Sequence, residues 1–422
     1  MRLNVTSEIG RLKSVLIHLP GREIDLMVPP MMEQLLFDDI LYGQVAREEH
    51  RRFQQLIRFV ADDVYDIQDL LEEILDDVEI KQHVVRDLGR RNRFKRKLVA
   101  SLLEMPPAEL AEVLIAGIAR ETESGELPQF DLYPIPNMFF MRDPQIVLGD
   151  RVVVSSMATQ ARRRESLLSK YVFENHPLFQ RADPFWVDFM ATDPERPMPR
   201  NMPTLEGGDV IVPRRDLLLV GVTERTNKAG VEALMRSLKE ANAGVNTVII
   251  VEIPRQRSFM HLDTIFTLIN RHECLIYPPV ILPSGGQAAR VTMVDLTKKR
   301  TLAHSEQKSL LGALKKKGFD LEPIYCGGKS AVDQQREQWT DGANAFALAP
   351  GIILLYERNV RTAEALQKNG YHIVYEDDLL LGRTELETWT DKKYALQIAG
   401  NELSRARGGP RCMTMPLERE EL

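Results

Sequence analysis

The segment Arg407-Gly408-Gly409-Pro410-Arg411-Cys412 places a thiol close to the C-terminus. A Gly-Gly-Pro run does not fit the interior of a helix or strand, so the segment predicts a turn. Arg407 and Arg411 precede the thiol within this segment, and nearby cations lower the pKa of a thiol towards the reactive thiolate. The pattern predicts a cysteine nucleophile at Cys412. A buried structural thiol is the alternative.

A histidine and an acid stand two positions apart in Met260-His261-Leu262-Asp263. On a strand, residues i and i+2 face the same side, so the two side chains would project together. An imidazole titrates near neutrality and can give and take a proton. The alternative is a core histidine that bonds to its neighbour. A metal site built from His261, His272 and Cys274 lacks a fourth ligand at a recognised spacing, so we expect no metal.

Two further acids stand in unusual surroundings. Asp143 follows an aromatic pair in Phe139-Phe140-Met141-Arg142-Asp143-Pro144, and Glu206 precedes two glycines in Leu205-Glu206-Gly207-Gly208-Asp209. Glycines let the backbone turn sharply or approach a ligand closely. Either motif by itself is more often a turn than a site.

Taken together, these motifs bring one thiol, one histidine and the carboxylates of Asp143, Glu206 and Asp263 to a common site. Such negative charge raises the pKa of Cys412 while the pocket is empty. The arrangement makes chemical sense if the substrate carries a positive charge on the group that is attacked. A planar guanidinium pairs with carboxylates and has an electrophilic central carbon.

The elements that position these residues repeat along the chain. A polar residue, an apolar strand, a turn and a second apolar strand begin at Asp143, Asp209, Asp263 and Asn344, and Glu8 begins a shortened first copy. Helical patterns follow at 225–242 and 361–370. A module of this kind cannot bury its apolar face alone, whereas copies arranged in a ring can. The ring would bring the repeated polar residues to one centre.

Residues 44–120 show helical periodicity instead. Val60, Val64, Ile67, Leu71, Ile74 and Val78 form one apolar stripe, and Met105-Pro106-Pro107 predicts a helix end and a new start. Charges in 61–80 are acidic and 81–97 is strongly basic. Nucleic-acid binding by the basic run is an alternative, but oppositely charged solvated helix faces explain the pattern better.

Composition supports a soluble, cytoplasmic protein. The 422 residues are 44% hydrophobic and 27% charged, with a formal net charge of −6, which argues against a nucleic-acid partner. Cys274, Cys326 and Cys412 are widely spaced and predict no disulfide framework. Neither a signal peptide nor an apolar run long enough to span a membrane is evident.

The set FMRDP, LEGGDV, MHLDT, REQWTDGANAFALAPG and RGGPRCMTMP, with LLFDDI and TQARRRE, closely resembles the arginine deiminases of the guanidino-group-modifying superfamily. The matches span Leu35 to Pro416. The resemblance implies a five-bladed pseudo-symmetric α/β propeller over residues 1–43 and 121–422, with a helical bundle inserted at 44–120. It also implies hydrolysis of L-arginine to L-citrulline and ammonia without a cofactor. We further expect a homo-oligomer, because propeller enzymes with an exposed helical bundle often self-associate.

Carried over by position, the resemblance makes Cys412 the nucleophile and His261 the general acid and base. Asp143 and Asp263 would clamp the guanidinium, and Glu206 would hold a guanidinium nitrogen and His261. The expected substrate-binding residues are Asn137 and Phe140 near the α-amino end and stem, Arg162 and Arg225 at the α-carboxylate, and Arg407 in the loop before the nucleophile. Arg163 and Arg164 are alternatives to Arg162. Thr414 stands where the family's motif often has serine.

Three alternatives stay open. An amidinotransferase would pass the same covalent intermediate to an amine. A methylarginine or agmatine hydrolase would differ at the far end of the pocket, and the arginines expected at the carboxylate disfavour agmatine. A non-catalytic amino-acid-binding or scaffold propeller would have little need for Cys412, His261 and the carboxylates together.

Overall fold

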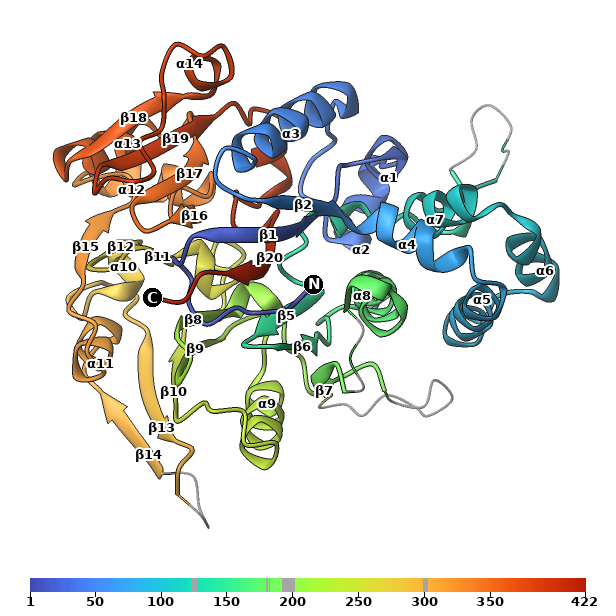
Figure 1. The fold of residues 1–422 in the computed structure, drawn as a ribbon, viewed down its shortest axis with the longest axis horizontal. Coiled ribbons are helices and arrows are strands. Elements are labelled where there is room, and N and C mark those ends of the chain that lie inside the picture. The colour runs from blue at the N-terminus through green and yellow to red at the C-terminus, as the bar shows by residue number, and fades with distance from the viewer. Residues whose placement is uncertain (121, 123–127, 180, 182, 192–201, 299–302) are drawn as a thin grey trace.

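The structure is a computed structural model that describes residues 1–120, 122, 128–179, 181, 183–191, 202–298 and 303–422. It shows a mixed α/β fold, as predicted. The described strands form five sheets of three or more strands and one two-stranded sheet, and none of these sheets closes on itself (Figure 1). The five larger sheets and their helices surround a common centre (Figure 1).

The four predicted hairpins are confirmed. Each pairs two antiparallel strands directly after its polar residue, because an apolar run, a tight turn and a second apolar run favour a hairpin. The pairs are β5 (Gln145–Leu148) with β6 (Arg151–Val154), β8 (Val210–Arg214) with β9 (Leu217–Val222), β11 (Phe266–Asn270) with β12 (Glu273–Ile276), and β16 (Phe346–Ala349) with β17 (Ile352–Tyr356).

Each hairpin gains at least one parallel strand from later in the chain. The strands that complete these sheets are β7 (Phe185–Asp188), β10 (Thr247–Glu252), β13 (Arg290–Asp295), β14 (Ala303–Gln307), β15 (Glu322–Tyr325), β18 (Tyr371–Tyr375) and β19 (Lys393–Ile398). The parallel pairs are β6 with β7, β9 with β10, β12 with β15 and β17 with β19. Because parallel strands need a crossover, helices connect them. These helices are α8 (Arg163–Asn175), α9 (Lys228–Glu240), α10 (Pro278–Ile281), α11 (Leu310–Lys316), α13 (Val360–Lys368) and α14 (Glu376–Leu380), whereas α12 (Ala331–Trp339) lies between β15 and β16 and links two sheets.

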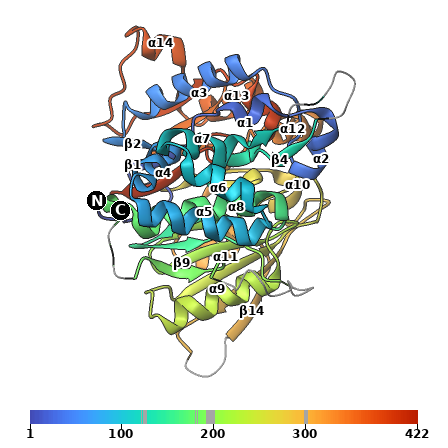
Figure 2. The ribbon, with the colours of Figure 1, turned by 90° about the vertical axis from the view of Figure 1, so that its right-hand side faces the viewer.

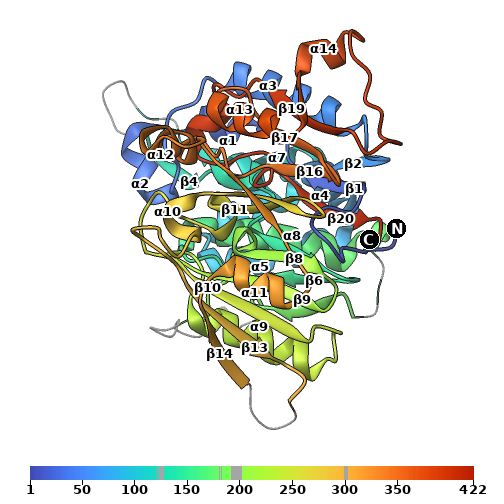
Figure 3. The same cartoon turned by 90° about the vertical axis from the view of Figure 1, so that its left-hand side faces the viewer.

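The fifth sheet joins the two ends of the chain. Its central strand, β1 (Leu12–Ile17), pairs antiparallel with β20 (Met415–Arg419) and parallel with β2 (Asp63–Asp66). Glu8 precedes β1, so the first copy has one strand of its own and borrows the other from the C-terminus. The two termini consequently lie at the same side of the molecule (Figures 2 and 3).

The helical block contains more than helices. Its elements are α3 (Gly43–Ile57), α4 (Ile67–Leu75), α5 (Val78–Asn92), α6 (Arg96–Glu104) and α7 (Pro107–Ala116), preceded by α1 (Arg22–Asp25) and α2 (Met32–Leu35) and followed by β3 (Ile118–Ala119) and β4 (Phe130–Leu132). The break between α6 and α7 falls at Met105-Pro106, as predicted. The single helix predicted from the stripe at 60–78 is wrong. Val64 lies in β2, and Asp66 and Asp77 each start a new helix by accepting backbone hydrogen bonds.

Parts of residues 44–120 pack with the sheets. β2 extends the sheet of β1, and Arg52 of α3 pairs with Glu376 and Asp377 of α14. Helices α4 to α7 extend away on the side that faces the viewer in Figure 2. The insertion at 44–120 therefore stays a prediction, and its boundary at residue 121 lies outside the described residues.

Apolar side chains fill the space between sheets and helices in three clusters, which include Leu71, Leu268 and Leu354. No helix among the described residues is both long and apolar enough to cross a membrane. The centre itself is lined by charged and amide side chains, which form the candidate site.

Candidate active site

A nearly filled cavity lies where the hairpins meet. The volume within it that the centre of a water molecule can occupy is only about 20 Å³, so the opposite walls almost touch. Eight of the ten predicted site residues line it. The lining residues are Leu36, Asp38, Asn137, Phe140, Asp143, Arg162, Arg225, Met260, His261, Thr264, Ala406, Arg407 and Cys412. Glu206 and Asp263 bond to residues of this wall.

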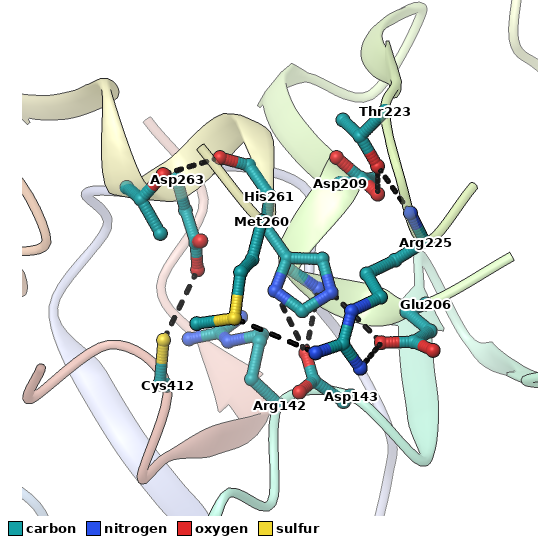
Figure 4. Close-up of polar contacts among 12 residues, drawn as sticks. Arg142, Asp143, Glu206, Asp209, Thr223, Arg225, Met260, His261, Asp263 and Cys412 are labelled. Atoms are coloured by element: carbon teal, nitrogen blue, oxygen red, sulfur yellow. Dashed lines mark hydrogen bonds and ion pairs between the residues drawn. The ribbon is translucent and has the colours of Figure 1, made fainter. Parts of the chain in front are cut away.

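Cys412 is fixed by hydrogen bonds from both sides of its backbone. Its N–H donates to Oδ1 of Asn344 at 3.1 Å, and its carbonyl accepts from the N–H of Arg142 at 3.0 Å. The turn before it contacts the ring of Phe140 so closely that a Cβ on Gly408 would lie 2.2 Å from a ring carbon. The sulfur lies 3.8 Å from Oδ2 of Asp263 (Figure 4). The prediction of a turn at the thiol is confirmed.

His261 faces two carboxylates. Its Nε2 bonds to Oε2 of Glu206 at 2.8 Å, and its Nδ1 lies 3.8 Å from Oδ1 of Asp143 (Figure 4). A Cβ on Gly208 would lie 2.7 Å from the imidazole, so the second glycine of the Leu205–Asp209 motif makes room for this ring. The predicted strand at His261 and Asp263 is wrong, because residues 262–264 form a 3-10 turn that ends before β11.

These acids keep His261 protonated. Burial lowers the pKa of His261, but the charge of Asp143 and the hydrogen bond to Glu206 outweigh it and raise the pKa to about 9. Burial raises the pKa of Glu206, yet the bond from His261 and the charge of Arg225 bring it down to about 2. At neutral pH the site holds an imidazolium beside a carboxylate, so His261 is prepared to act as an acid.

Arg162 is the arginine of its run that lines the cavity. Its Nη1 donates to Asp143 at 3.0 Å and lies 3.5 Å from Glu206, while Nε and Nη2 donate to Glu165. Arg163 instead contacts the sulfur of Met202, and Arg164 donates to a backbone carbonyl. In this structure the guanidinium of Arg162 therefore binds Asp143, the carboxylate that was expected to bind the guanidinium of the substrate.

Asp263 is held by Arg411. Its Oδ2 accepts from Nη1 of Arg411 at 2.7 Å, whereas its buried Oδ1 has no hydrogen-bond partner among the described residues. Arg411 also makes a two-pronged bond to Glu8, with 3.1 Å from Nε and 3.1 Å from Nη2. Arg411, which was expected to lower the pKa of the thiol, thus pairs with two acids instead.

The thiol of Cys412 is disfavoured as an anion in the empty site. Burial raises its pKa well above the ordinary value, and the charges of Asp263 and Asp143 raise it further. The prediction that the preceding arginines lower this pKa is wrong, because Arg411 turns to Glu8 and Asp263 and Arg407 stacks on a ring. The prediction that the carboxylates raise it in an empty pocket is confirmed.

The remaining predicted residues line the outer wall. Nη1 of Arg225 forms a long ion pair with Glu206 at 3.9 Å and has no hydrogen-bond partner within the described part of the chain. The guanidinium of Arg407 stacks 3.6 Å from the ring centre of Trp339, and its nitrogens have no hydrogen-bond partner among the residues that the structure describes. Asn137 donates to the carbonyl of Leu35 at 2.8 Å, and Phe140 is buried under the turn of Gly408.

The described residues contain one group of three side chains that could hold a metal, and it is not the group considered from the sequence. Asp143, Glu206 and His261 have ligand atoms within 4.8 Å of one another. Arg162 already places a cation against both of these carboxylates. His272 is exposed and Cys274 is buried in β12, so neither joins this group.

Successive modules are linked through their polar residues. Asp143 accepts from the N–H of Gly208 at 3.1 Å, and Asp209 accepts from the N–H of Leu262 at 2.9 Å. The side chain of Asn344 donates to the carbonyl of Asp263 at 3.2 Å. The bonds of Cys412 to Asn344 and to Arg142 complete a circuit that returns to the first hairpin.

From the sequence, several of these residues were recognised only as the polar residues that begin each repeat. Glu8, Asp209 and Asn344 were found by their positions before strands, yet their bonds to site residues were not predicted. Arg142 and Met260 gave no separate signal. Met260 lines the cavity and accepts from Nη2 of Arg225 at 3.5 Å (Figure 4).

Comparison with known proteins agrees with this geometry. A family model described as arginine deiminase matches residues 33–419. The chain belongs to the arginine deiminase family. An arginine deiminase of Clostridium perfringens (strain SM101 / Type A) is 35% identical over 100% of this chain and 98% of the relative. One of Streptococcus sanguinis (strain SK36) is 32% identical over 100% and 99%. As a member of the arginine deiminase family, the protein is an enzyme.

Solved structures with a similar fold are more distant. The substrate-bound N-terminal domain of ArgZ, a cyanobacterial arginine dihydrolase, matches 97% of this chain and 99% of its own, with 15% identity and a TM-score of 0.51. SxtG, an amidinotransferase from Microseira wollei, matches 100% and 98%, with 13% identity and a TM-score of 0.51. These two structures share the overall fold of this chain, which agrees with its membership of the arginine deiminase family.

Proposed function

We propose that this enzyme hydrolyses L-arginine to L-citrulline and ammonia, with Cys412 as the nucleophile. The observation that carries the proposal is that Cys412, His261 and Asp143 line one cavity, with Asp263 beside the sulfur. A guanidinium is the ligand that such a set of buried acids would stabilise. The relatives named arginine deiminase support the choice of substrate.

The first half of the reaction uses the acid form of His261. Binding of the guanidinium brings positive charge next to the thiol, so the proton of Cys412 is released to solvent and the thiolate attacks the central carbon. An S–C bond forms. The imidazolium of His261 gives its proton to the departing nitrogen, the C–N bond breaks, and ammonia leaves an S-alkylthiouronium held by Asp143 and Asp263.

The second half uses the base form of His261. Water enters the position that ammonia left, and the neutral imidazole takes a proton from it as its oxygen bonds to the central carbon. The C–S bond then breaks with the sulfur leaving as the thiolate, the hydroxyl proton of the intermediate passes to solvent, and citrulline is released. The carboxylates contribute mainly by orientation, which can supply several kcal/mol of the barrier, on the order of 7–11 at best.

The substrate's α-carboxylate requires free cationic donors. Among the described residues, one nitrogen of Arg225 and all three of Arg407 have no hydrogen-bond partner, whereas every nitrogen of Arg162 already bonds to an acid. We expect Arg225 and Arg407 to meet the carboxylate first. Arg162 can join them only after it releases Asp143, and that release would leave Asp143 free for the guanidinium.

The circuit of hydrogen bonds supports the finer architecture. Five sheets, each contributing a polar residue to one centre and each linked to the next, are what a pseudo-symmetric five-bladed propeller requires. We propose that arrangement, with an inserted helical bundle at 44–120. We also expect self-association, which sedimentation equilibrium of the full chain would measure.

An end-point assay tests the reaction and separates it from its rivals. Incubation with L-arginine should yield citrulline and ammonia in equal amounts, and added glycine should not divert the product. Formation of a guanidino-acetate product would instead indicate an amidinotransferase. Agmatine should react far more slowly than arginine because it lacks the carboxylate for Arg225 and Arg407. Absence of both citrulline and ammonia would refute the proposal.

The ionisation of the thiol offers an independent test. Because burial and the two acids raise the pKa of Cys412 in the empty site, a bound guanidinium should lower it. The thiolate absorbance should be titrated with and without a non-reactive guanidino ligand, using Cys412→Ala as the blank. An unchanged pKa on binding would contradict substrate-assisted ionisation.

A further inference from the structure

A buried arginine cluster lies directly behind Asp263 and Cys412. Arg142, Arg411 and Arg419 are at most 4% exposed. Glu8 and Asp263 are the acids whose charges act on them: Arg411 contacts both, Glu8 acts on all three, and Asp263 acts on Arg142. Two acids therefore face three guanidinium groups in a region from which water is excluded.

Arg411 is held rigidly between the two acids. Its side chain is 2% exposed, and the side chains of Glu8 and Asp263 are 10% and 0% exposed. Nη2 also donates to the carbonyl of Val210 at 2.9 Å. Glu8 in turn accepts from the N–H of Val212 at 3.2 Å, so it is tied to β8. Through Nη1 of Arg411, this geometry holds Oδ2 of Asp263 in place.

The bond from Arg411 decides which oxygen of Asp263 is available. Oδ2 takes the hydrogen bond of Arg411 and lies near the sulfur, while the buried Oδ1 has no hydrogen-bond partner in the described part of the chain. Oδ1 is therefore the atom that can accept a hydrogen bond from a substrate guanidinium. How strongly it does so depends on how much of the charge of Asp263 the arginines cancel.

Glu8 limits this cancellation. Burial raises the pKa of Glu8, but Arg411 and Arg142 outweigh it and lower the pKa to about 2, so Glu8 is ionised at neutral pH. Its two-pronged bond uses Nε and Nη2 of Arg411 and leaves Nη1 for Asp263. Without the charge of Glu8, Asp263 would be the acid left to face the charges of both Arg411 and Arg142.

We propose that Glu8 is a positioning residue for the guanidinium: it takes up the positive charge of Arg411, so that Asp263 keeps the negative charge with which Oδ1 binds the substrate. This inference rests on the proposed function, since it concerns the affinity of the same site for arginine. It assigns a role to a residue that lies outside the cavity wall.

The test compares a charged ligand with a neutral one of the same shape. In the Cys412→Ala protein, which cannot turn over, the Kd of L-arginine and of L-citrulline would be measured by isothermal titration calorimetry, with and without Glu8→Gln. Glu8→Gln should weaken arginine about tenfold and citrulline less than twofold, because only arginine carries the charge. Glu8→Asp, which keeps the charge, should restore arginine binding to within about threefold.

Glu376→Gln is the matched control. Glu376 is also buried, pairs with Arg52 at 2.6 Å and accepts a backbone N–H at 3.1 Å, but lies away from the site. It should leave both Kd values unchanged. Equal losses for arginine and citrulline, or an unchanged arginine Kd in Glu8→Gln, would overturn the role of Glu8. If the Cys412→Ala protein itself binds no arginine, the proposed function fails instead.

Discussion

Helices α4 to α7 and the centre of the sheets differ in where their charged side chains lie. In α4–α7 the charged residues lie mostly at the surface, and most Leu, Ile and Val side chains are buried or half-buried, although Val78 is exposed. Asp87, which pairs with Arg91, is the buried charged residue among them. At the centre the charged side chains are themselves buried. They include Glu8, Arg142, Asp143, Arg162, Glu206, Asp209, Arg225, His261, Asp263, Asp341, Arg407, Arg411 and Arg419.

This difference indicates what each region does. Removing an ion from water costs several kcal/mol, and close pairing offsets that cost only in part. A chain that needed stability alone would fill its centre with apolar side chains, as α4–α7 do. Among the described residues, Oδ1 of Asp263 at the centre instead has no hydrogen-bond partner, nor have one nitrogen of Arg225 and those of Arg407. The centre is built to bind a ligand, and the helices are built to fold.

The largest effect should come from the nucleophile. Cys412→Ala should lower kcat by about 10⁴-fold or more, because no other group can form the covalent intermediate. Cys274 is equally buried but belongs to an apolar strand. Cys274→Ala should lower the free energy of unfolding by about 1 kcal/mol and keep kcat within about twofold. Citrulline formation and urea denaturation measure both. Appreciable turnover by Cys412→Ala would remove the nucleophile from the mechanism.

The packing of His261 predicts an intermediate effect. Gly208→Ala would place a methyl group 2.7 Å from the imidazole, so the ring must move. A displacement near 1 Å typically lowers a rate by about 10²-fold, and we expect a 10- to 100-fold lower kcat, by order of magnitude. Gly286→Ala, whose Cβ would contact nothing within 4 Å, is the control. Unchanged kcat in Gly208→Ala would show that His261 tolerates the shift.

The ionic setting of His261 predicts a shift in pH dependence. The proton on His261 is needed for departure of ammonia, so kcat/KM should fall as pH rises through about 9. Glu206→Gln removes the charge and weakens the bond at Nε2, which moves this fall to lower pH, by about one unit or more. A pH–rate profile and imidazole NMR titration measure the shift. An identical basic limb in both proteins would argue against the Glu206–His261 bond.

Stability should follow the same pKa values. The raised pKa of His261 contributes stability that is fully present below about pH 6.5 and is lost as pH rises through about 9. The lowered pKa of Glu206 contributes stability above about pH 4.5, which is lost as pH falls through about 2. Urea unfolding should therefore show the difference between wild type and Glu206→Gln shrinking above pH 9.

The smallest effect should come from the basic face of α5. Arg86 and Arg90 are exposed, and exposed charges contribute little to stability. The double change Arg86→Glu and Arg90→Glu should leave kcat and KM within about twofold. A large loss of activity would mean that α5 is coupled to the central site, so that the helices and the centre would not have separate roles.

The sequence predicted the parts of the fold that depend on local pattern. Hairpins after Asp143, Asp209, Asp263 and Asn344 were correct because turn residues and apolar runs determine them locally. The stripe at 60–78 led to the wrong prediction of a single helix because Val60 and Val64 fit a helical spacing. The pairing of β2 with β1 decides the conformation of Val64 instead. That pairing joins residues about fifty positions apart, and no local pattern contains it.

The candidate site was predictable as a set of residue types and less so as a set of contacts. Cys412, His261 and Asp143 do line one cavity. The direction of Arg411 could not be foreseen, because Glu8 lies 403 positions away in sequence. The pairing of Arg162 with Asp143 was missed for the same reason: tertiary structure alone decides which acid a long side chain reaches.

The hydrogen-bond circuit that closes at Cys412 and Arg142 makes the cavity depend on segments that are far apart in sequence. The carbonyl of Cys412 accepts from Arg142, its N–H donates to Asn344, and β20 pairs with β1. Cleavage of the chain before residue 412 would leave every acid of the pocket in the larger fragment, but it would remove the candidate nucleophile and open the circuit. Proteolysis at this one turn would therefore separate binding residues from the thiol.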